Sequence, residues 1–364
     1  MVSETAVERV TARPYTVPTD APEADGTLEW DSTTLVLMEV AAGGQTGLGY
    51  TYAAAAAARL VLDVLAPAVA GTDAMQVPAA WDRMRRTVRN LGRDGLCAAA
   101  ISAVDVALWD LKAKLLDLPL ARLLGVRRES VAIYGSGGFT SYSDARLEAQ
   151  LGGWVAQGLR QVKMKVGAHP ADDPARVARA RATIGPEAGL FVDANGAFTA
   201  RQALAFAERC AGLGVSWFEE PVSSDDLPGL AAVRARLPVT MEVAAGEYGY
   251  DPGYFDRMLA AGAVDVLQAD ATRCCGVTGF LAAAALCDAR GTPLSAHTAP
   301  ALHLHVCCAA PRLRHLEWFH DHVRIEAMLF DGAPSPDGGA IRPDLGRPGL
   351  GLQFRQADAE RYAA

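Results

Sequence analysis

The stretch from residue 161 to residue 221 decides the fold, because three short apolar runs alternate in it with alanine-rich segments: QVKMKV (161–166), LFVDAN (190–195) and VSWFEEP (215–221). Each run is rich in β-branched or aromatic residues and ends in polar ones, which predicts a strand. The segments between the runs, at 174–184 and 200–213, have the length and apolar spacing of helices. Strands that alternate with helices predict a parallel sheet with right-handed crossovers.

The same alternation continues on both sides of this stretch. Further strands are predicted at 131–136, 239–243, 264–268, 293–296 and 315–318, with another helix at 144–158. Eight strands in about 190 residues favour a (β/α) barrel, and an open doubly wound sheet is the alternative. The barrel is expected to occupy residues 126–330.

Residues 1–125 follow a different pattern. A strand at 33–40 and helices at 53–69, 78–90 and 97–117 predict a small α+β domain. The segment YTVPTDAPEADGTLEWD (15–31) is polar and acidic and is expected to be a loop. The Gly- and Pro-rich residues 331–364 are expected to form a tail that returns to this first domain.

The overall composition excludes several classes of protein. With 364 residues, 51% hydrophobic residues and a net charge of −8, the chain can bury a large core and lacks the basic surface of a general nucleic-acid binder. The seven cysteines show no CxxC spacing, which favours reduced thiols. The most apolar long stretch, 52–70, contains Arg59 and Asp63 and is not expected to span a membrane. With no signal-peptide pattern at the N-terminus, we expect a cytoplasmic protein.

Ionisable residues stand at the ends of the predicted barrel strands, where the active sites of such barrels lie. From Lys165 onward they recur at intervals of 28, 26, 28, 23, 27 and 20 residues, about one strand–helix unit each. The series consists of Lys163 and Lys165, then Asp193, Glu219, Glu247, Asp270, His297 and Glu317. Each residue alone has an ordinary interpretation, such as a surface lysine, a helix cap or a core histidine. The repeated position in seven units favours one shared site.

The residue types in this series indicate metal and proton-transfer chemistry. Three carboxylates on successive strands, Asp193, Glu219 and Glu247, suit a hard cation such as Mg²⁺ or Mn²⁺ better than zinc. Lysines on one side of this group and His297 on the other would give a substrate a base on each face. Asp270 can orient the imidazole and raise its basicity.

Seven motifs together make the sequence resemble the enolase superfamily, and within it the mandelate racemase-like subgroup. They are KMK (163–165), VDAN (192–195), WFEEP (217–221), AAGE (244–247), QADATRCCGVTGF (268–280), SAH (295–297) and LEW (316–318). The resemblance covers nearly the whole chain. It implies an α+β capping domain followed by an α/β modified TIM barrel, (β/α)7β, which agrees with the predicted layout.

The resemblance also implies roles for individual residues. Asp193, Glu219 and Glu247 would bind Mg²⁺, Lys165 would be the base on one face, and His297 with Asp270 would act on the other. Lys163 would contact the substrate carboxylate and lower the pKa of Lys165, and Glu317 would hydrogen-bond that carboxylate. Asn195, Ser136 and Tyr15 would be further substrate contacts, Tyr15 at the start of the loop (15–31) that covers the substrate.

The implied reaction is removal of the proton next to a carboxylate, which gives an enediolate. Loss of a β-hydroxyl would make the protein an acid-sugar dehydratase, a hydro-lyase whose product is a 2-keto-3-deoxy acid. Protonation on the opposite face would make it a racemase or epimerase of a 2-hydroxy acid. The polar loop at 15–31 favours a polyhydroxylated acid, and therefore the dehydratase.

Other classes of function receive less support from the sequence. HLH (303–305), with His315, His320 and His322, is typical of a zinc hydrolase only on an early barrel strand, and here it lies in an apolar helical run. GSGG (135–138) lacks the Lys-Ser/Thr of a phosphate-binding loop. A non-catalytic binding protein is the remaining alternative. By the resemblance, the expected partners are a small carboxylate and further copies of the chain, as a dimer or octamer, with no nucleic acid or membrane.

Overall fold

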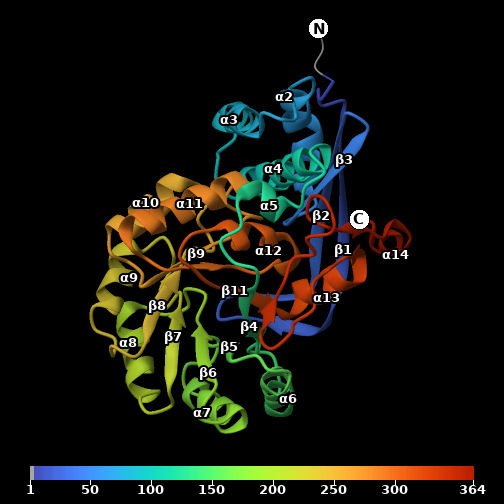
Figure 1. Ribbon diagram of the computed structural model, residues 1–364. Helices are drawn as coiled ribbons and strands as arrows, with labels where there is room; N and C mark the ends of the chain where they lie inside the picture. Colours follow the sequence, from blue (N-terminus) through green and yellow to red (C-terminus); the bar gives the residue numbers. More distant parts are fainter. Residues whose placement is uncertain (1–3) are drawn as a thin grey trace.

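The computed structural model describes residues 4–364, which form an antiparallel capping sheet with its helices, a parallel barrel and a C-terminal segment (Figure 1). The capping sheet has the order β1 (Arg9–Ala24), β2 (Glu29–Ala42), β3 (Gln45–Tyr52). Both neighbouring pairs of strands are antiparallel. In the ribbon these strands stand at one side of the molecule, and the barrel lies beside them.

The segment 15–31 is not a loop, which corrects the sequence-based expectation. It forms the end of β1, the turn and the start of β2, with paired residues from Tyr15↔Leu35 to Ala24↔Glu29 and an irregularity between Pro18 and Glu23. The β-branched residues Thr16, Val17 and Thr19 favour a strand, and long antiparallel pairing satisfies the backbone polar groups of this acidic segment. The segment that was expected to cover the site is therefore a hairpin.

The helices of the capping domain contact the capping sheet mainly through one long helix, α4 (Leu96–Leu115). They are α1 (Ala56–Leu60), the π-helical turn η1 (Val61–Leu65), α2 (Ala66–Val69), α3 (Val77–Thr87), η2 (Val88–Asn90), α4 and α5 (Leu120–Leu124). Helix α4 lies against β3, where Cβ atoms at Gly47 and Gly49 would come within 2.1 and 2.2 Å of the carbonyls of Ala107 and Ala103. Glycine is required there by the close approach of helix to sheet.

Eight parallel strands close the barrel, as predicted. They are β4 (Val131–Gly137), β5 (Gln161–Lys165), β6 (Gly189–Asp193), β7 (Val215–Glu219), β8 (Glu242–Ala245), β9 (Val266–Ala269), β10 (Leu294–Ala296) and β11 (Leu313–Phe319). Closure comes from the pairing of β11 with β4, from Leu316↔Ile133 to Phe319↔Ser136. Strand β8 begins three residues later than expected, since Val239 is 99% exposed.

A helix follows each of the first seven barrel strands. These helices are α6 (Asp144–Ala156), α7 (Asp173–Ile184), α8 (Ala200–Arg209), α9 (Leu227–Arg234), α10 (Pro252–Ala260), α11 (Gly276–Arg290) and α12 (Pro300–Ala309). The pattern is (β/α)7β, and α13 (His320–Leu329) follows the last strand. In Figure 1 the helices α6 to α11 form the outer layer of the barrel.

The barrel interior holds a buried apolar cluster made by Tyr134, Phe191, Trp217, Ala244 and Val266. Phe191 and Trp217 stack with ring centroids 5.1 Å apart. Because strand side chains alternate in direction, the residues two positions later, Asp193 and Glu219, point to the same side. The Trp217 indole donates to Glu219 at 2.9 Å, so this aromatic layer supports the charged layer next to it.

The C-terminal segment contacts both domains. It contains β12 (Phe330–Asp331), β13 (Ala340–Ile341), β14 (Gln353–Phe354), α14 (Gln356–Ala359) and η3 (Glu360–Tyr362). β13 pairs with β4 of the barrel. On the capping side, Leu120 donates its backbone N–H to Gly349, and Tyr15 forms a bridge with Ala363. Over residues 4–364, no helix combines the length and apolar character needed to cross a membrane.

Candidate active site

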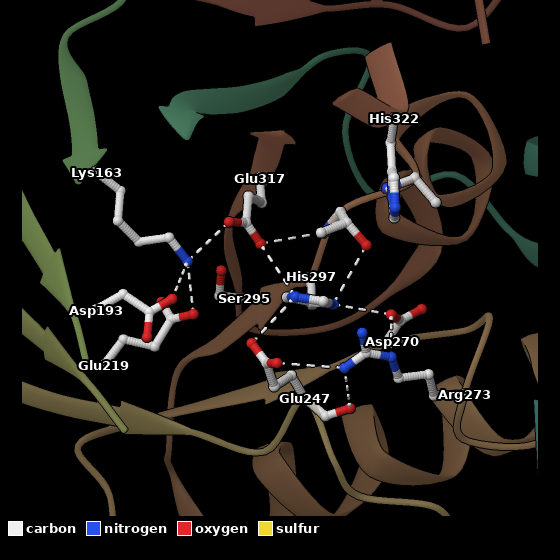
Figure 2. Close-up of polar contacts among 12 residues, drawn as sticks. Lys163, Asp193, Glu219, Glu247, Asp270, Arg273, Ser295, His297, Glu317 and His322 are labelled. Atoms are coloured by element: carbon white, nitrogen blue, oxygen red, sulfur yellow. Dashed lines mark hydrogen bonds and ion pairs between the residues drawn. The ribbon is translucent and has the colours of Figure 1, made fainter. Parts of the chain in front are cut away.

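The ionisable residues at the strand ends converge at one end of the barrel, as the sequence predicts. Lys163 and Lys165 lie on β5, Asp193 ends β6, Glu219 ends β7 and Glu317 lies on β11. Asp270 and His297 directly follow β9 and β10, and Glu247 follows β8 after one glycine. All eight side chains are buried. Figure 2 shows the carboxylates of Asp193 and Glu219 next to the Lys163 ammonium and that of Glu247 next to His297.

Three of these carboxylates form a group that fits a hard cation. Asp193, Glu219 and Glu247 each offer an oxygen, and these oxygens lie within 4.8 Å of one another. Burial, together with the charge of Asp193, raises the pKa of Glu219 to about 8. The buried carboxyl of Glu220 has an oxygen without a hydrogen-bond partner within residues 4–364. Such crowding of buried carboxyl groups calls for a positive charge, and all-oxygen donors match Mg²⁺.

The lysines of β5 neutralise part of this negative charge. The Lys163 ammonium lies 2.5 Å from Glu219, 2.7 Å from Glu317 and 3.3 Å from Asp193. Lys165 lies 2.6 Å from Asp193 and donates to Asn195 Oδ1 at 3.0 Å. Burial by itself would lower the pKa of Lys165, but the Asp193 carboxylate raises it above its usual range.

His297 is held on the opposite side of the carboxylates. Its Nδ1 lies 2.8 Å from Asp270, and its Nε2 lies 3.1 Å from Glu247. Burial lowers the pKa of this imidazole, but Glu247 and then Glu317 overcome that effect and raise it to about 10. Arg273 lies 3.3 Å from Glu247 and 3.6 Å from Asp270, so it joins the carboxylates on both sides of the histidine.

A strained turn follows His297. Thr298 and Ala299 have φ angles of +52° and +39°, a region that costs energy for residues with a Cβ. Three backbone N–H groups of this turn donate to side chains: Thr298 to Glu317 at 3.2 Å, Ala299 to His322 at 3.3 Å and Ala301 to Glu326 at 3.0 Å. These acceptors stabilise the turn and thereby fix the direction of the imidazole that precedes it.

A cavity of about 370 Å³ opens over this site between the two domains. From the barrel it is lined by Lys165, Asn195, Glu247, Tyr248, Arg273, His297, Thr298, Glu317, Phe319 and His322. The capping domain contributes residues from the β1–β2 hairpin and from the end of β3. The cavity therefore brings both proposed bases, Lys165 and His297, into one space with part of the carboxylate group.

The three expected substrate contacts have different outcomes. Asn195 lines the cavity and bonds Lys165. Ser136 is buried on β4 opposite Lys163 and does not line the cavity. Its hydroxyl has no hydrogen-bond partner within residues 4–364. Tyr15 is wrongly predicted: it is 1% exposed and packs against Phe354, because its position in β1 turns the ring toward the C-terminal segment.

The alternative motifs have structural explanations. His303 accepts the N–H of Ala271 and His305 that of Ala121, so both imidazoles of the HLH run bond backbone inside the fold. Gly138 of the GSGG run donates its N–H to Gln150. A second group able to hold an ion, Asp20, Glu23 and His320, lies at the hairpin. Asp20 there is already paired with Arg146 at 2.8 Å and His320 at 3.1 Å.

Several cavity residues were missed or misjudged from the sequence. Arg273 stands three residues after Asp270, a helical spacing that could have identified it as a partner of that carboxylate. For His322 the sequence indicates only a possible zinc ligand or a structural helix histidine. Trp30 lies in the segment 15–31 that is expected to cover the substrate, whereas no sequence pattern indicates that Tyr52 at the end of β3 reaches the barrel mouth.

Two protein families match the chain. Residues 9–125 match the mandelate racemase/muconate lactonizing enzyme N-terminal domain, and residues 146–359 match the enolase C-terminal domain-like family. A 3,6-anhydro-alpha-L-galactonate cycloisomerase from Streptomyces coelicolor is 32% identical over 95% of this chain and 96% of its own length. An L-talarate/galactarate dehydratase from Salmonella typhimurium is 31% identical over 79% of this chain and 74% of its own.

Solved structures match over nearly the full length. A mandelate racemase/muconate lactonizing enzyme-like protein from Rubrobacter xylanophilus superposes with a TM-score of 0.97 at 52% identity, covering 99% of this chain and 100% of that one. A racemase from Streptomyces coelicolor A3(2), solved with bound magnesium, gives a TM-score of 0.93 at 30% identity, covering 98% and 100%.

Proposed function

The chain belongs to the mandelate racemase/muconate lactonizing enzyme family of the enolase superfamily, and from this premise we propose that it is a Mg²⁺-dependent acid-sugar dehydratase. It would remove the proton next to a substrate carboxylate and then eliminate the β-hydroxyl as water. Mn²⁺ could take the place of Mg²⁺, since both prefer oxygen ligands.

One observation carries this proposal: two groups able to transfer protons face each other across a cation-binding carboxylate group. Lys165 lies on β5 and His297 follows β10, which are three positions apart around the closed barrel in one direction and five in the other. Asp193, Glu219 and Glu247 lie between them, and the cavity gives a substrate access to both.

The chemistry requires strong stabilisation of negative charge. A proton next to a carboxylate is weakly acidic, and its removal gives an enediolate with a second negative charge. Mg²⁺ held by Asp193, Glu219 and Glu247 would supply positive charge to the substrate carboxylate oxygens. Lys163 adds a fixed ammonium group beside Glu317 and would hold the substrate carboxylate through a charge-assisted hydrogen bond. Glu317 can donate a hydrogen bond to that carboxylate only in its protonated form.

The two proton-transfer groups would then complete the reaction. Lys165 would take the α-proton on one face as the neutral amine, since a Mg²⁺ ion bound to Asp193 would offset the carboxylate charge that raises the pKa of this lysine. His297, oriented by Asp270, gives a proton to the β-hydroxyl on the other face as the C–O bond breaks. Water leaves, and the resulting enol becomes the 2-keto-3-deoxy acid by tautomerisation. The dehydratase among the relatives supports this outcome.

The second candidate is a racemase or epimerase of a 2-hydroxy acid. It is favoured by the same pair of groups, because protonation by the group opposite the base inverts the α-carbon. A racemase among the similar structures adds support. The catalytic residues alone serve both reactions, so the product must decide between them.

The proposal is tested with a library of sugar acids in deuterated water, with a 2-keto-acid assay and proton NMR. A keto product with loss of water supports the dehydratase. Exchange of the α-proton with formation of an epimer and no keto product supports the racemase. Absence of both from every acid in the library contradicts the proposed chemistry.

We also propose that the protein works in the cytoplasm as a homo-oligomer, a dimer or an octamer. All seven cysteines are free and buried, which fits a reducing compartment. Light scattering coupled to size-exclusion chromatography tests the assembly, and a monomer at micromolar concentration would contradict it.

A further inference from the structure

The capping domain supplies a wall of the cavity that carries little charge. Its lining residues are Asp25, Leu28, Trp30, Ser32, Thr33, Thr34, Tyr52, Ala53 and Ala54. The only charged side chain among these nine is acidic. A substrate bound by its carboxylate at the strand ends directs its far end toward this wall. The residues of the wall therefore determine which chemical group the substrate can carry at that end.

Asp25 is occupied by the hairpin turn. Its Oδ1 accepts the backbone N–H of Thr27 at 2.5 Å and that of Leu28 at 2.7 Å. The Thr27 hydroxyl donates to the same oxygen at 3.0 Å. Asp25 therefore caps the turn, and it adds negative charge to the wall where a second substrate carboxylate would need a cation.

The cations on the barrel side of the cavity already face carboxylates. Lys165 lies 2.6 Å from Asp193. Arg273 lies between Glu247, at 3.3 Å, and Asp270, at 3.6 Å. Both cations belong to the proton-transfer end of the cavity and balance charges there.

A neutral donor stands next to this wall instead. Nδ1 of His322 accepts the N–H of Ala299 at 3.3 Å, so the ring proton of the neutral imidazole is on Nε2. The ring stacks on Tyr52 of the capping sheet, with centroids 3.5 Å apart and an interplanar angle of 10°. Figure 2 shows the imidazole pointing toward the turn that carries His297.

The charge state of this imidazole agrees with its hydrogen bond. Burial, together with the nearby His297, lowers the pKa of His322 well below its usual value, so the ring is neutral. Within residues 4–364 the ring makes its hydrogen bond through Nδ1 and none through Nε2, and the side chain lines the cavity. His322 thus offers one N–H to a bound molecule.

We propose that the wall and His322 bind an uncharged, hydroxyl-bearing end of the substrate, so that the enzyme acts on monocarboxylic sugar acids and discriminates against dicarboxylic ones. This inference rests on the proposed function and specifies its substrate class. His322 is the specificity-determining residue: its Nε2–H donates to a substrate hydroxyl.

The physical reason is the asymmetry between a hydroxyl and a second carboxylate. A hydroxyl can accept from His322 and donate to a threonine or serine of the wall. A second carboxylate would lose its hydration beside Asp25, and among the described lining residues no cation is unpaired and able to replace that hydration, which costs far more than burial of a hydroxyl.

Matched pairs of acids that differ only at the far carbon test the inference: D-gluconate with D-glucarate, and D-galactonate with D-galactarate. We expect kcat/KM, or the rate of α-proton exchange where no water is lost, to favour the monocarboxylate by at least about tenfold, or 1.4 kcal/mol. Equal or faster reaction of the dicarboxylates overturns the inference while the proposed function stands. No reaction with any acid of a wider sugar-acid library overturns the proposed function, and the inference with it.

Charge added to the wall provides the complementary test. Thr34→Arg places a cation in the wall, and Thr34→Gln is the uncharged control of similar length. The arginine variant should raise the reactivity of D-glucarate relative to D-gluconate by at least about tenfold, and the glutamine variant should leave the ratio unchanged. If both folded variants shift the ratio equally, charge does not determine selection. Circular dichroism and the melting temperature verify folding.

Two variants separate recognition by His322 from its support of the turn. His322→Asn keeps a polar acceptor near Ala299 and removes the far N–H, whereas His322→Gln places an amide N–H near the Nε2 position. We expect the asparagine variant to raise KM for the monocarboxylate about tenfold, with kcat nearly unchanged and partial rescue by glutamine. If both variants lose kcat equally and KM does not change, His322 only stabilises the turn after His297. That result would overturn its role in specificity.

Discussion

Glu326 on α13 makes the stability of the protein depend on pH in a way that one substitution can isolate. This buried carboxyl accepts the Tyr50 hydroxyl of the capping domain at 2.5 Å and the Ala301 N–H at 3.0 Å. Burial raises its pKa from 4.5 to about 8. The group is therefore protonated in the folded protein and ionised in the unfolded chain over the range between these two values.

The sign and size of the effect follow from linkage. The folded state binds the additional proton, so the contribution of Glu326 is fully present below pH 4.5 and is lost as the pH rises through about 8. At 1.36 kcal/mol per pKa unit, the shift amounts to roughly 4–5 kcal/mol at full loss. Glu326→Gln removes the titration and keeps the shape, so wild type should lose stability relative to this variant with rising pH.

Urea unfolding of both proteins at pH 5, 7 and 9 measures this difference. The midpoint of wild type should fall relative to that of the variant, mostly between pH 5 and 9. Glu23 and Asp105 also have raised pKa values, to about 8 and about 7, but they titrate in both proteins and cancel in the comparison. Parallel midpoints across the three pH values would refute the reasoning and indicate that the carboxyl is solvated in the folded state.

Three further predictions concern the site and the barrel interior. Asp270→Asn should lower kcat by about 100-fold or more with little change in KM, because Asp270 orients His297; steady-state kinetics measure this, and a pure KM effect would contradict it. Removal of metal with EDTA should abolish turnover and Mg²⁺ should restore it, while Glu219→Gln should raise the Mg²⁺ concentration required by at least about tenfold; turnover independent of Mg²⁺ would contradict the metal site. Phe191→Ala should destabilise the protein by about 3–5 kcal/mol, since it removes the ring stacked on Trp217 beneath the charged layer; unfolding in urea measures this, and a loss below about 1 kcal/mol would contradict it.

The barrel and its charged rim could be predicted from the sequence because both depend on short-range regularities. Strand–helix alternation predicts the parallel order, and the period of two along a strand places Asp193 and Glu219 on the inner side. The distance between Lys165 and His297 along the chain is irrelevant once the strands close, so their convergence follows from topology.

The structure of the capping domain is harder to predict from the sequence, because it depends on contacts between residues far apart in the chain. The polar composition of 15–31 indicates a loop, but pairing with β2 turns it into a hairpin, and Tyr15 then faces Phe354 and not the cavity. His322 enters the cavity through its stack on Tyr52, a contact between residues 270 positions apart in the sequence. No local pattern encodes a contact of this kind.

The central claim is that Lys165 and His297 stand on opposite faces of one bound substrate, so that each can reach the α-carbon from its own side. Exchange of the α-proton with deuterated water, measured by NMR for both α-epimers of a reactive acid, tests it in the Lys165→Ala and His297→Asn variants. Each variant should lose exchange with one epimer and retain measurable exchange with the other, in opposite order. Full exchange with both epimers in both variants, at the wild-type rate and with the fold intact, would contradict the claim.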